Sequence, residues 1–439
     1  MVNIESLYDA LAASVDAESG GRRLATRAEE LCKAQDPVSP ETTSEELRLK
    51  FAESDAISTI AVVENGLPVG LVNRNIFMEQ YARPYARDLF GRKSCIAFMD
   101  KTPLVVDSHT PIETLVRAAV DSGGKVLTDG YIVTKDGAYL GIGKGYDLMR
   151  AMSDIEAEKT RQLMASINYA SLIQRSHLVE SDDVLQNHVG DHGLMWMPRD
   201  VVGGDAYFFR KVTDGTFGCV FDCTGHGVPG AFMTLIVMSF LEQQIHSEHS
   251  GIQPGEIIGR LNTYLKKVLR QDDRGSSDAA NADKISNDGL DAAMFVLSDD
   301  HATMRFASAK LSMLLVRAGA PEVEVIEGER IPVGYADTPT STVWPTQQVE
   351  LGRDCLVVIP TDGVVDQIGE TRRIAHGKKR IVQFLEQHTG LSATQVIPAF
   401  EQAFTQWQGA QKRRDDVTLL AFRTRKSLQA AMPAIHRVA

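Results

Sequence analysis

Four short acidic motifs, each standing where an apolar run ends, constrain the fold of this chain more than any other feature. A single aspartate after a strand is usually a turn or helix-capping residue. Several such motifs, flanked by glycines or by a second aspartate, indicate instead that distant strand ends meet at one place. The motifs are VVGGD, FDCTGHG, PTDG and RRDD, which contain Asp205, Asp222, Asp362 and the pair Asp415 and Asp416.

The chemistry of these acids favours a hard divalent cation. Mg²⁺ and Mn²⁺ prefer carboxylate, carbonyl and water oxygens in octahedral geometry. The five cysteines are scattered and lack the paired short spacing of a zinc site. The motifs therefore predict a magnesium or manganese site built from strand ends.

The composition limits the classes of protein to consider. The chain has 439 residues, 43% of them hydrophobic, which is enough for about two to three packed domains. A formal net charge of -12 argues against a nucleic-acid partner. The N-terminus is acidic and the longest apolar stretch, 232–241, is about half a membrane span, so we expect no membrane association. The scattered cysteines predict a reduced, cytoplasmic location.

An internal repeat occupies the N-terminal third of the chain. Residues 43–77 and 110–149 both have the pattern of a helix, a strand, a hairpin turn, a second strand and a helix start. The hairpin turns fall at Asn65-Gly66 and Asp136-Gly137. Because one copy is too small to bury both faces of its sheet, we expect the two copies to pack against each other.

The repeat resembles a CBS-domain pair, a regulatory module named after cystathionine β-synthase. In that family each copy ends in a Gly-x-x-Thr-x-x-Asp stretch whose Thr and Asp hold a ribose or phosphate. The second copy keeps Asp147 and carries Lys144 in place of Thr, whereas the first has Asn73 and Ile76. The resemblance implies a nucleotide or small-molecule ligand at Lys144 and Asp147. A dimerisation or packing unit without a ligand is the alternative.

A long helix is predicted after the repeat, over residues 148–180. The segment has no Pro or Gly and spaces its apolar residues mostly three or four apart. Its apolar stripe is narrow, which favours pairing with the same helix of a second subunit in a parallel homodimer. The alternative is a helix that lies on its own domain.

The C-terminal part resembles the metal-dependent protein phosphatases (PPM, protein phosphatase 2C class), in the bacterial branch typified by the stage II sporulation phosphatase SpoIIE. In that family the VGGD aspartate acts through metal-bound water, and the aspartate of the D-x-x-GHG turn bridges two metal ions. The carbonyl after it, the TDG aspartate and the first aspartate of the final pair complete the coordination. The matching positions are Asp205, Asp222, Cys223, Asp362 and Asp415, with the role of Asp416 left open.

The resemblance implies an α+β fold in which helices flank a sandwich of two antiparallel sheets. It also implies a serine/threonine protein phosphatase, a phosphoric monoester hydrolase with two Mn²⁺ or Mg²⁺ ions. In the SpoIIE branch the substrate would be a phosphorylated STAS-domain anti-sigma-factor antagonist of a partner-switching pathway. The order of repeat, long helix and phosphatase domain predicts that the N-terminal part regulates the enzyme through the helix.

Five further positions have open roles. Lys310 stands where the branch often has the glycine of an Ala-Gly-His turn, and is either a phosphate contact or an exposed turn residue. Arg199 is either a phosphate clamp or a surface charge, and His226 is either a proton donor or a support of its turn. Asp288 and Asp291 precede another strand and are candidates to lie near the metal ions.

Five segments are predicted from these patterns. They are an N-terminal helical segment (1–35), the CBS-like pair (36–147), the linker helix (148–180), the phosphatase domain (181–426) and a tail (427–439). A polar stretch, 272–289, predicts a mobile loop. Two other functions remain open at this point, a catalytically silent phosphoprotein-binding protein and a nucleotide-sensing scaffold.

Overall fold

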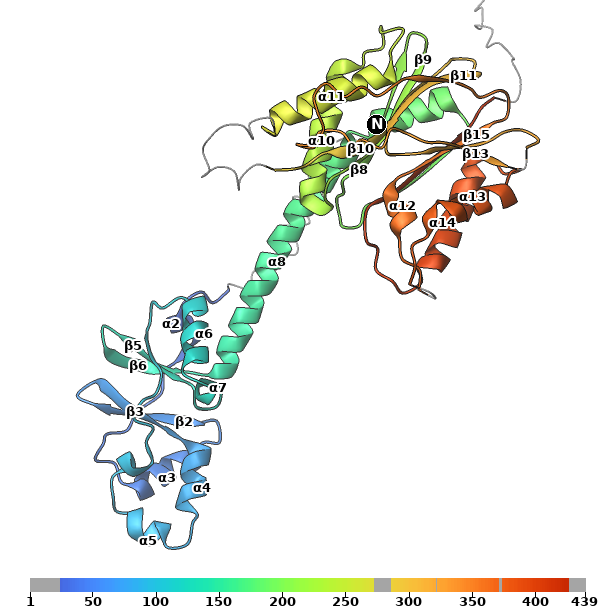
Figure 1. Cartoon of the computed structure of the whole chain (residues 1–439). Helices are drawn as coiled ribbons and strands as arrows, with labels where there is room; N and C mark the ends of the chain where they lie inside the picture. Colours follow the sequence, from blue (N-terminus) through green and yellow to red (C-terminus); the bar gives the residue numbers. More distant parts are fainter. Residues whose placement is uncertain (1–23, 272–285, 321, 371–372, 426–439) are drawn as a thin grey trace, which may run out of the picture. The chain divides into compact units, whose positions relative to one another are not determined.

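The computed structural model describes residues 24–271, 286–320, 322–370 and 373–425. The chain divides into two compact units, Met1–Ala165 and Ser166–Ala439 (Figure 1). The boundary falls inside helix α8 (Gly145–Ser176). The predicted tail, most of the N-terminal segment and most of the polar loop lie outside the described residues. Within the described residues, no helix is both long and apolar enough to cross a membrane.

The N-terminal unit contains the predicted order of helix, two strands and helix twice. The first copy consists of α3 (Ser44–Glu53), β2 (Thr59–Glu64), β3 (Leu67–Asn73) and α4 (Arg74–Tyr81). The second consists of α6 (Ile112–Asp121), the short α7 (Lys125–Asp129), β5 (Tyr131–Lys135), β6 (Ala138–Gly143) and the start of α8. The connecting elements are α2 (Ala28–Leu31), β1 (Cys32–Lys33), α5 (Ala86–Phe90), a 3₁₀ helix (Cys95–Phe98) and β4 (Val105–Asp107).

Local chemistry explains the predicted turns and helix start. Both hairpin turns have positive φ at both central residues, 50° and 81° at Asn65-Gly66 and 52° and 80° at Asp136-Gly137. This left-handed backbone matches the twist of a two-residue hairpin. Helix α3 begins at a capping box in which Thr43 and Glu46 bond each other's backbone N–H groups.

The two copies pack against each other through their hairpins. Buried Ala61 and Leu71 of the first copy form one apolar cluster with Ile132 and Ile142 of the second. In addition, the Tyr139 N–H donates to the Gly66 carbonyl at 2.9 Å. The expected packing of one copy on the other is therefore present, while the resemblance to a CBS pair stays a prediction.

The C-terminal unit is a mixed α+β domain built on two antiparallel five-stranded sheets. The first has the strand order β14-β11-β10-β9-β8, and the second β13-β12-β15-β16-β7. The first sheet consists of β8 (Asp205–Val212), β9 (Gly215–Cys223), β10 (Leu290–Leu297), β11 (Thr303–Ala309) and β14 (Gln347–Glu350). The second consists of β7 (His192–Met197), β12 (Met313–Val316), β13 (Val323–Ile326), β15 (Leu356–Pro360) and β16 (Val417–Arg423).

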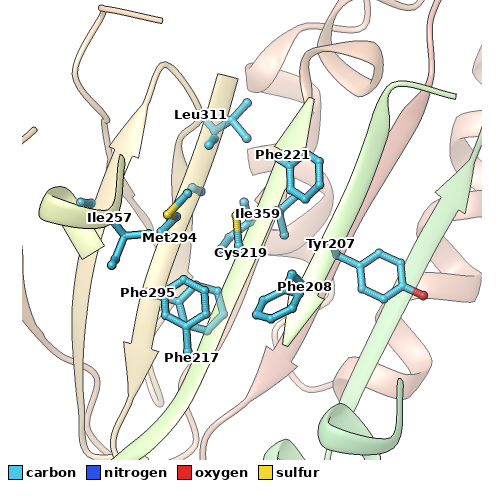
Figure 2. Close-up of a cluster of buried hydrophobic side chains, with 14 of the residues drawn as sticks. Tyr207, Phe208, Phe217, Cys219, Phe221, Ile257, Met294, Phe295, Leu311 and Ile359 are labelled. Atoms are coloured by element: carbon cyan, nitrogen blue, oxygen red, sulfur yellow. The ribbon is translucent and has the colours of Figure 1, made fainter. Parts of the chain in front are cut away.

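The core lies between the sheets, and helices cover their outer faces. Figure 2 shows Phe295 of the first sheet and Ile359 of the second, which belong to this core, and Phe208 and Phe217, which lie on the outer, helix-covered face of the first sheet. Helices α10 (Gly227–Gln244) and α11 (Pro254–Val268) pack on the first sheet, whereas α13 (Gly377–Gln387) and α14 (Ala393–Gln408) pack on the second (Figure 1). The sheet faces that meet each other exclude water, which fixes the relative position of the strand ends.

The long helix ends earlier than its apolar pattern predicts. Helix α8 ends at Ser176, and a separate short helix α9 (Val179–Val184) follows, continued by a π-helix (Leu185–Val189). Leu178, between the two helices, is buried in the main core, and the Asp182 N–H donates to its carbonyl. Burial of Leu178 thus turns the chain at a place where helical periodicity gives no signal.

Candidate active site

Three aspartates form a row across neighbouring strands of the first sheet. Asp205 in β8 lies directly opposite Asp222 in β9, and Asp222 lies opposite Asp291 in β10. Directly opposed residues of antiparallel strands have side chains on the same face, with Cβ atoms about 4.5–5.5 Å apart. Strand register therefore gathers three carboxyl groups at one end of this sheet.

The second sheet brings two more acids to the same place. Asp362 begins helix α12 (Asp362–Asp366), two residues after the end of β15, and Asp415 precedes β16. The carboxyl groups of Asp222 and Asp362 lie within hydrogen-bonding reach of each other. The charge of Asp415 acts on both. The structure thus brings Asp205, Asp222, Asp362 and Asp415 together from four distant motifs.

Burial and mutual repulsion disfavour the charged form of these acids. Burial raises the pKa of Asp205 to about 7. The pKa of Asp222 is raised well above its ordinary value of 3.8, chiefly by burial and then by the charges of Asp205 and Asp362. Burial also raises the pKa of Asp362. A cation among them would offset both effects.

The donor set fits hydrated magnesium or manganese ions. Asp205 Oδ1 is buried without a hydrogen-bond partner, while Oδ2 accepts a 2.8 Å hydrogen bond from Thr361 Oγ1. In the described part of the chain, no group of three or more His, Cys, Asp or Glu side chains is arranged to hold one metal ion. Three side chains per ion are not required, because Mg²⁺ commonly binds one or two carboxylates and keeps several waters. The Asp205–Asp222 and Asp222–Asp362 pairs, with the unpartnered Oδ1, meet that requirement.

Asp416 faces a different neighbour from Asp415. Its carboxylate accepts backbone hydrogen bonds of 2.6 Å from the N–H groups of Arg199 and Gly204. A Cβ atom at Gly203 would lie 2.6 Å from Asp416 Oδ1, so only glycine allows this close approach. The residue whose role the sequence left open therefore holds the loop that leads to Asp205.

The basic residues proposed from the sequence lie around this cluster. Lys310 Nζ is 3.2 Å from Asp291 Oδ2. Arg199 is exposed, and its guanidinium donates to the Arg414 carbonyl at 3.0 Å. His226 Nδ1 is 2.9 Å from Asp200 Oδ2, a partner that supports the turn.

Comparison with known proteins identifies the C-terminal unit. The family model "Stage II sporulation protein E (SpoIIE)" matches residues 213–425, which include three of the four acidic motifs. The solved SiaA-PP2C domain of Pseudomonas aeruginosa is 30% identical, with a TM-score of 0.52, over 61% of this chain and 99% of that chain. The chain belongs to the SpoIIE family of PP2C-type phosphatases. It is accordingly a serine/threonine phosphatase of a metal-dependent class.

Two further solved structures match part of this SpoIIE-family chain at lower identity. The phosphatase domain of SpoIIE from Bacillus subtilis, with a fragment of its regulatory domain, is 14% identical over 54% of this chain and 63% of that chain, with a TM-score of 0.41. The RsbU and RsbW domains of Rv1364c from Mycobacterium tuberculosis are 18% identical over 54% of this chain and 60% of that chain, with a TM-score of 0.41. No curated protein sequence matches the chain.

Sequence reasoning missed one buried contact of the SpoIIE-family domain. Gln174, near the end of α8, is 4% exposed. Its Nε2 donates to the Gly203 carbonyl at 2.7 Å and to Thr234 Oγ1 at 3.0 Å, and its Oε1 accepts from the Gly203 N–H at 3.3 Å. A glutamine on a helix carries no sequence signal for such a contact, because the same residue is common on exposed faces.

In the N-terminal unit of this SpoIIE-family protein, the proposed nucleotide residues have separate partners. Asp147 Oδ2 is 2.6 Å from Lys33 Nζ, and Lys144 Nζ donates to the Ala56 carbonyl at 3.4 Å. Asp147 and Lys33 also line a cavity of about 280 Å³ with Arg150. A nucleotide site at Lys144 and Asp147 stays a prediction.

Proposed function

We propose that this phosphatase removes phosphate from a phosphorylated STAS-domain anti-sigma-factor antagonist in a partner-switching pathway. Two Mn²⁺ or Mg²⁺ ions would be held by Asp205, Asp222, Asp362 and Asp415 and by the Cys223 carbonyl. The observation that carries the metal site is the meeting of Asp222 and Asp362 from different sheets. Membership of the SpoIIE family supports the class of substrate.

Different residues of the chain have different roles at this site. When bound, the metal ions would lower the pKa of a water and neutralise charge on the phosphoryl group. Asp222 has both Asp205 and Asp362 as neighbours and would hold metal together with them. Thr361 orients Asp205 through its hydroxyl, and Asp416 holds the preceding loop through two backbone N–H groups. The buried strand ends keep bulk water from screening these charges.

Substitution of the two central acids tests the metal site. Asp222→Asn and Asp362→Asn each remove one anionic ligand and should lower manganese-dependent phosphate release at least about 100-fold, as loss of a dominant electrostatic group does. Glu322→Gln removes an exposed carboxylate of the same domain and serves as the matched control. Thermal melting establishes that each variant is folded. Unchanged manganese-dependent turnover in both aspartate variants would exclude the site.

The substrate class is tested with purified phosphoproteins. The full-length enzyme should dephosphorylate a phosphoserine STAS-domain antagonist with a kcat/KM at least about tenfold above that for an unrelated phosphoserine protein. Equal kcat/KM values for the two substrates would be consistent with phosphatase activity but would exclude the proposed substrate class.

We further propose that the N-terminal unit regulates the phosphatase, as a homodimer joined through α8 and with a nucleotide or small molecule bound near Lys144 and Asp147. Gln174 supports the helix as the route, since it bonds the loop that precedes Asp205. Deletion of residues 1–150 should change specific activity, and calorimetric titration of the full chain with adenosine nucleotides tests the ligand. Equal specific activity of the truncated and full-length enzymes would show that the N-terminal unit does not regulate the phosphatase.

A further inference from the structure

Lys310 has a backbone conformation that disfavours its own side chain. It follows strand β11 with φ of +65°, in the left-handed region. Glycine adopts this region freely, whereas a residue with a Cβ atom clashes with the following carbonyl. Glycine is also the residue that the family resemblance expects at this position. A lysine that persists in a strained conformation next to an active site indicates a function for its side chain.

The side chain of Lys310 is held toward the acidic cluster by Asp291. The Nζ–Oδ2 distance is 3.2 Å, and the Asp291 side chain is only 13% exposed. Asp291 lies opposite Asp222 in the register of β9 and β10, and Lys310 follows β11, the next strand of the same sheet. The charge of Lys310 also acts on Asp362. Lys310 therefore brings positive charge to the same end of the sheet as the four proposed metal-binding aspartates.

The ammonium group of Lys310 remains accessible to a ligand. The side chain is 45% exposed, and an ammonium has three donors, of which the contact with Asp291 occupies one. The neighbouring Tyr335 hydroxyl lies 2.7 Å from Thr224 Oγ1. Either hydroxyl can donate in this bond, and Thr224 Oγ1 also lies 3.0 Å from the Gly289 carbonyl oxygen. The Tyr335 hydroxyl thus already has a hydrogen-bond partner within the protein, whereas Lys310 has donors that can bind a ligand.

We propose that Lys310 binds an oxygen of the substrate phosphoryl group and of the product phosphate, and that Asp291 is a positioning residue that holds the ammonium in place. The inference rests on the proposed phosphatase site and deepens it by assigning a phosphate contact. A lysine suits this role because it is a compact point charge with several donors. Asp291, already balanced by Lys310, then needs no metal ion of its own.

Lys310 variants test the contact through phosphate affinity. In full-length enzyme saturated with manganese, Lys310→Met should raise both the KM for para-nitrophenyl phosphate and the inhibition constant of inorganic phosphate. The expected rise is about ten- to hundredfold, corresponding to loss of a hydrogen bond between charged groups. Lys310→Arg should stay within about threefold of wild type. Unchanged phosphate inhibition in Lys310→Met would overturn the proposal.

Lys310→Gly separates binding from stability. Because glycine relieves the positive φ, this variant should melt at a higher temperature than Lys310→Met, which also lacks the ammonium, while losing phosphate affinity to the same extent. The matched control is Lys211→Met, which breaks the 2.7 Å pair with Asp299 on the same sheet. An equal loss of phosphate affinity in Lys211→Met would show a general charge effect and overturn the contact.

Asp291→Asn tests the positioning role. It should weaken phosphate inhibition in the wild-type background and add little in the Lys310→Met background, because both changes act through one ammonium. If Asp291→Asn instead raises only the manganese requirement, Asp291 binds a cation and the positioning role is wrong. The Asp222→Asn variant distinguishes failure of the proposed metal site from failure of the proposed phosphate contact. If Asp222→Asn stays active, the proposed metal site is wrong. If Asp222→Asn is inactive but Lys310→Met has unaltered phosphate affinity, only the role of Lys310 is wrong.

Discussion

Asp222 and Asp362 lie within hydrogen-bonding reach of each other although they are positioned by strands of different sheets. Asp222 is in β9 of the first sheet, and Asp362 comes two residues after β15 of the second. Packing of the two sheets on a shared apolar core is what sets their separation. The stability of the sandwich and the geometry of the site are therefore linked.

The metal-free protein should lose stability as pH rises. The pKa of Asp205 is raised from 3.8 to about 7, so the folded state keeps a proton that the unfolded state has already lost. The stability that Asp205 contributes is therefore fully present below pH 3.8 and is lost as the pH rises through about 7, the reverse of an ion-paired carboxylate. Melting temperatures in the presence of a chelator should decrease over this interval. Asp205→Asn should make the decrease shallower, and saturating Mn²⁺ should oppose it. An unchanged slope in Asp205→Asn would contradict the assignment.

Asp415 and Asp416 are adjacent but should respond differently to substitution. Asp415→Asn should lower manganese-dependent activity about 100-fold or more while leaving the melting temperature unchanged, because Asp415 faces the acidic cluster. Asp416→Ala should destabilise the fold by about 3 kcal/mol, because two backbone N–H groups lose a charged acceptor. Denaturant unfolding and phosphate release measured on both variants check the distinction. Equal losses of stability in the two would contradict it.

The sequence predicts the acidic site better than it predicts the supports of that site. The aspartates are visible because several acidic motifs recur where apolar runs end, and the hairpins because Asn-Gly and Asp-Gly favour one type of turn. Asp416 and Gln174 bond backbone groups of residues that are distant in the chain. No pattern of side chains in the sequence predicts such contacts. The early end of α8 depends on burial of Leu178, which is likewise a tertiary effect.

Gln174→Ala should affect both stability and activity. The substitution leaves the N–H and carbonyl groups of Gly203 buried without these partners, which costs about 1–3 kcal/mol. It should also raise the manganese concentration needed for half-maximal activity, because the loop leading to Asp205 loses an anchor. The matched control on the same helix is the exposed Gln162, changed to alanine. A Gln174→Ala enzyme with normal manganese dependence would limit this contact to a structural role.

The proposed homodimer depends on apolar side chains that α8 leaves exposed. Leu163 is 65% exposed, Met164 46% and Ile173 36%, although each is more stable when removed from water. Leu163→Asp places a charge in the proposed interface and should raise the dimer dissociation constant at least about tenfold in sedimentation equilibrium. Val343→Asp is the matched control, since Val343 is 79% exposed and belongs to the phosphatase domain. The proposal that α8 forms the dimer contact would be wrong if the wild-type chain sediments as a monomer. It would also be wrong if the dissociation constant rises equally in both variants.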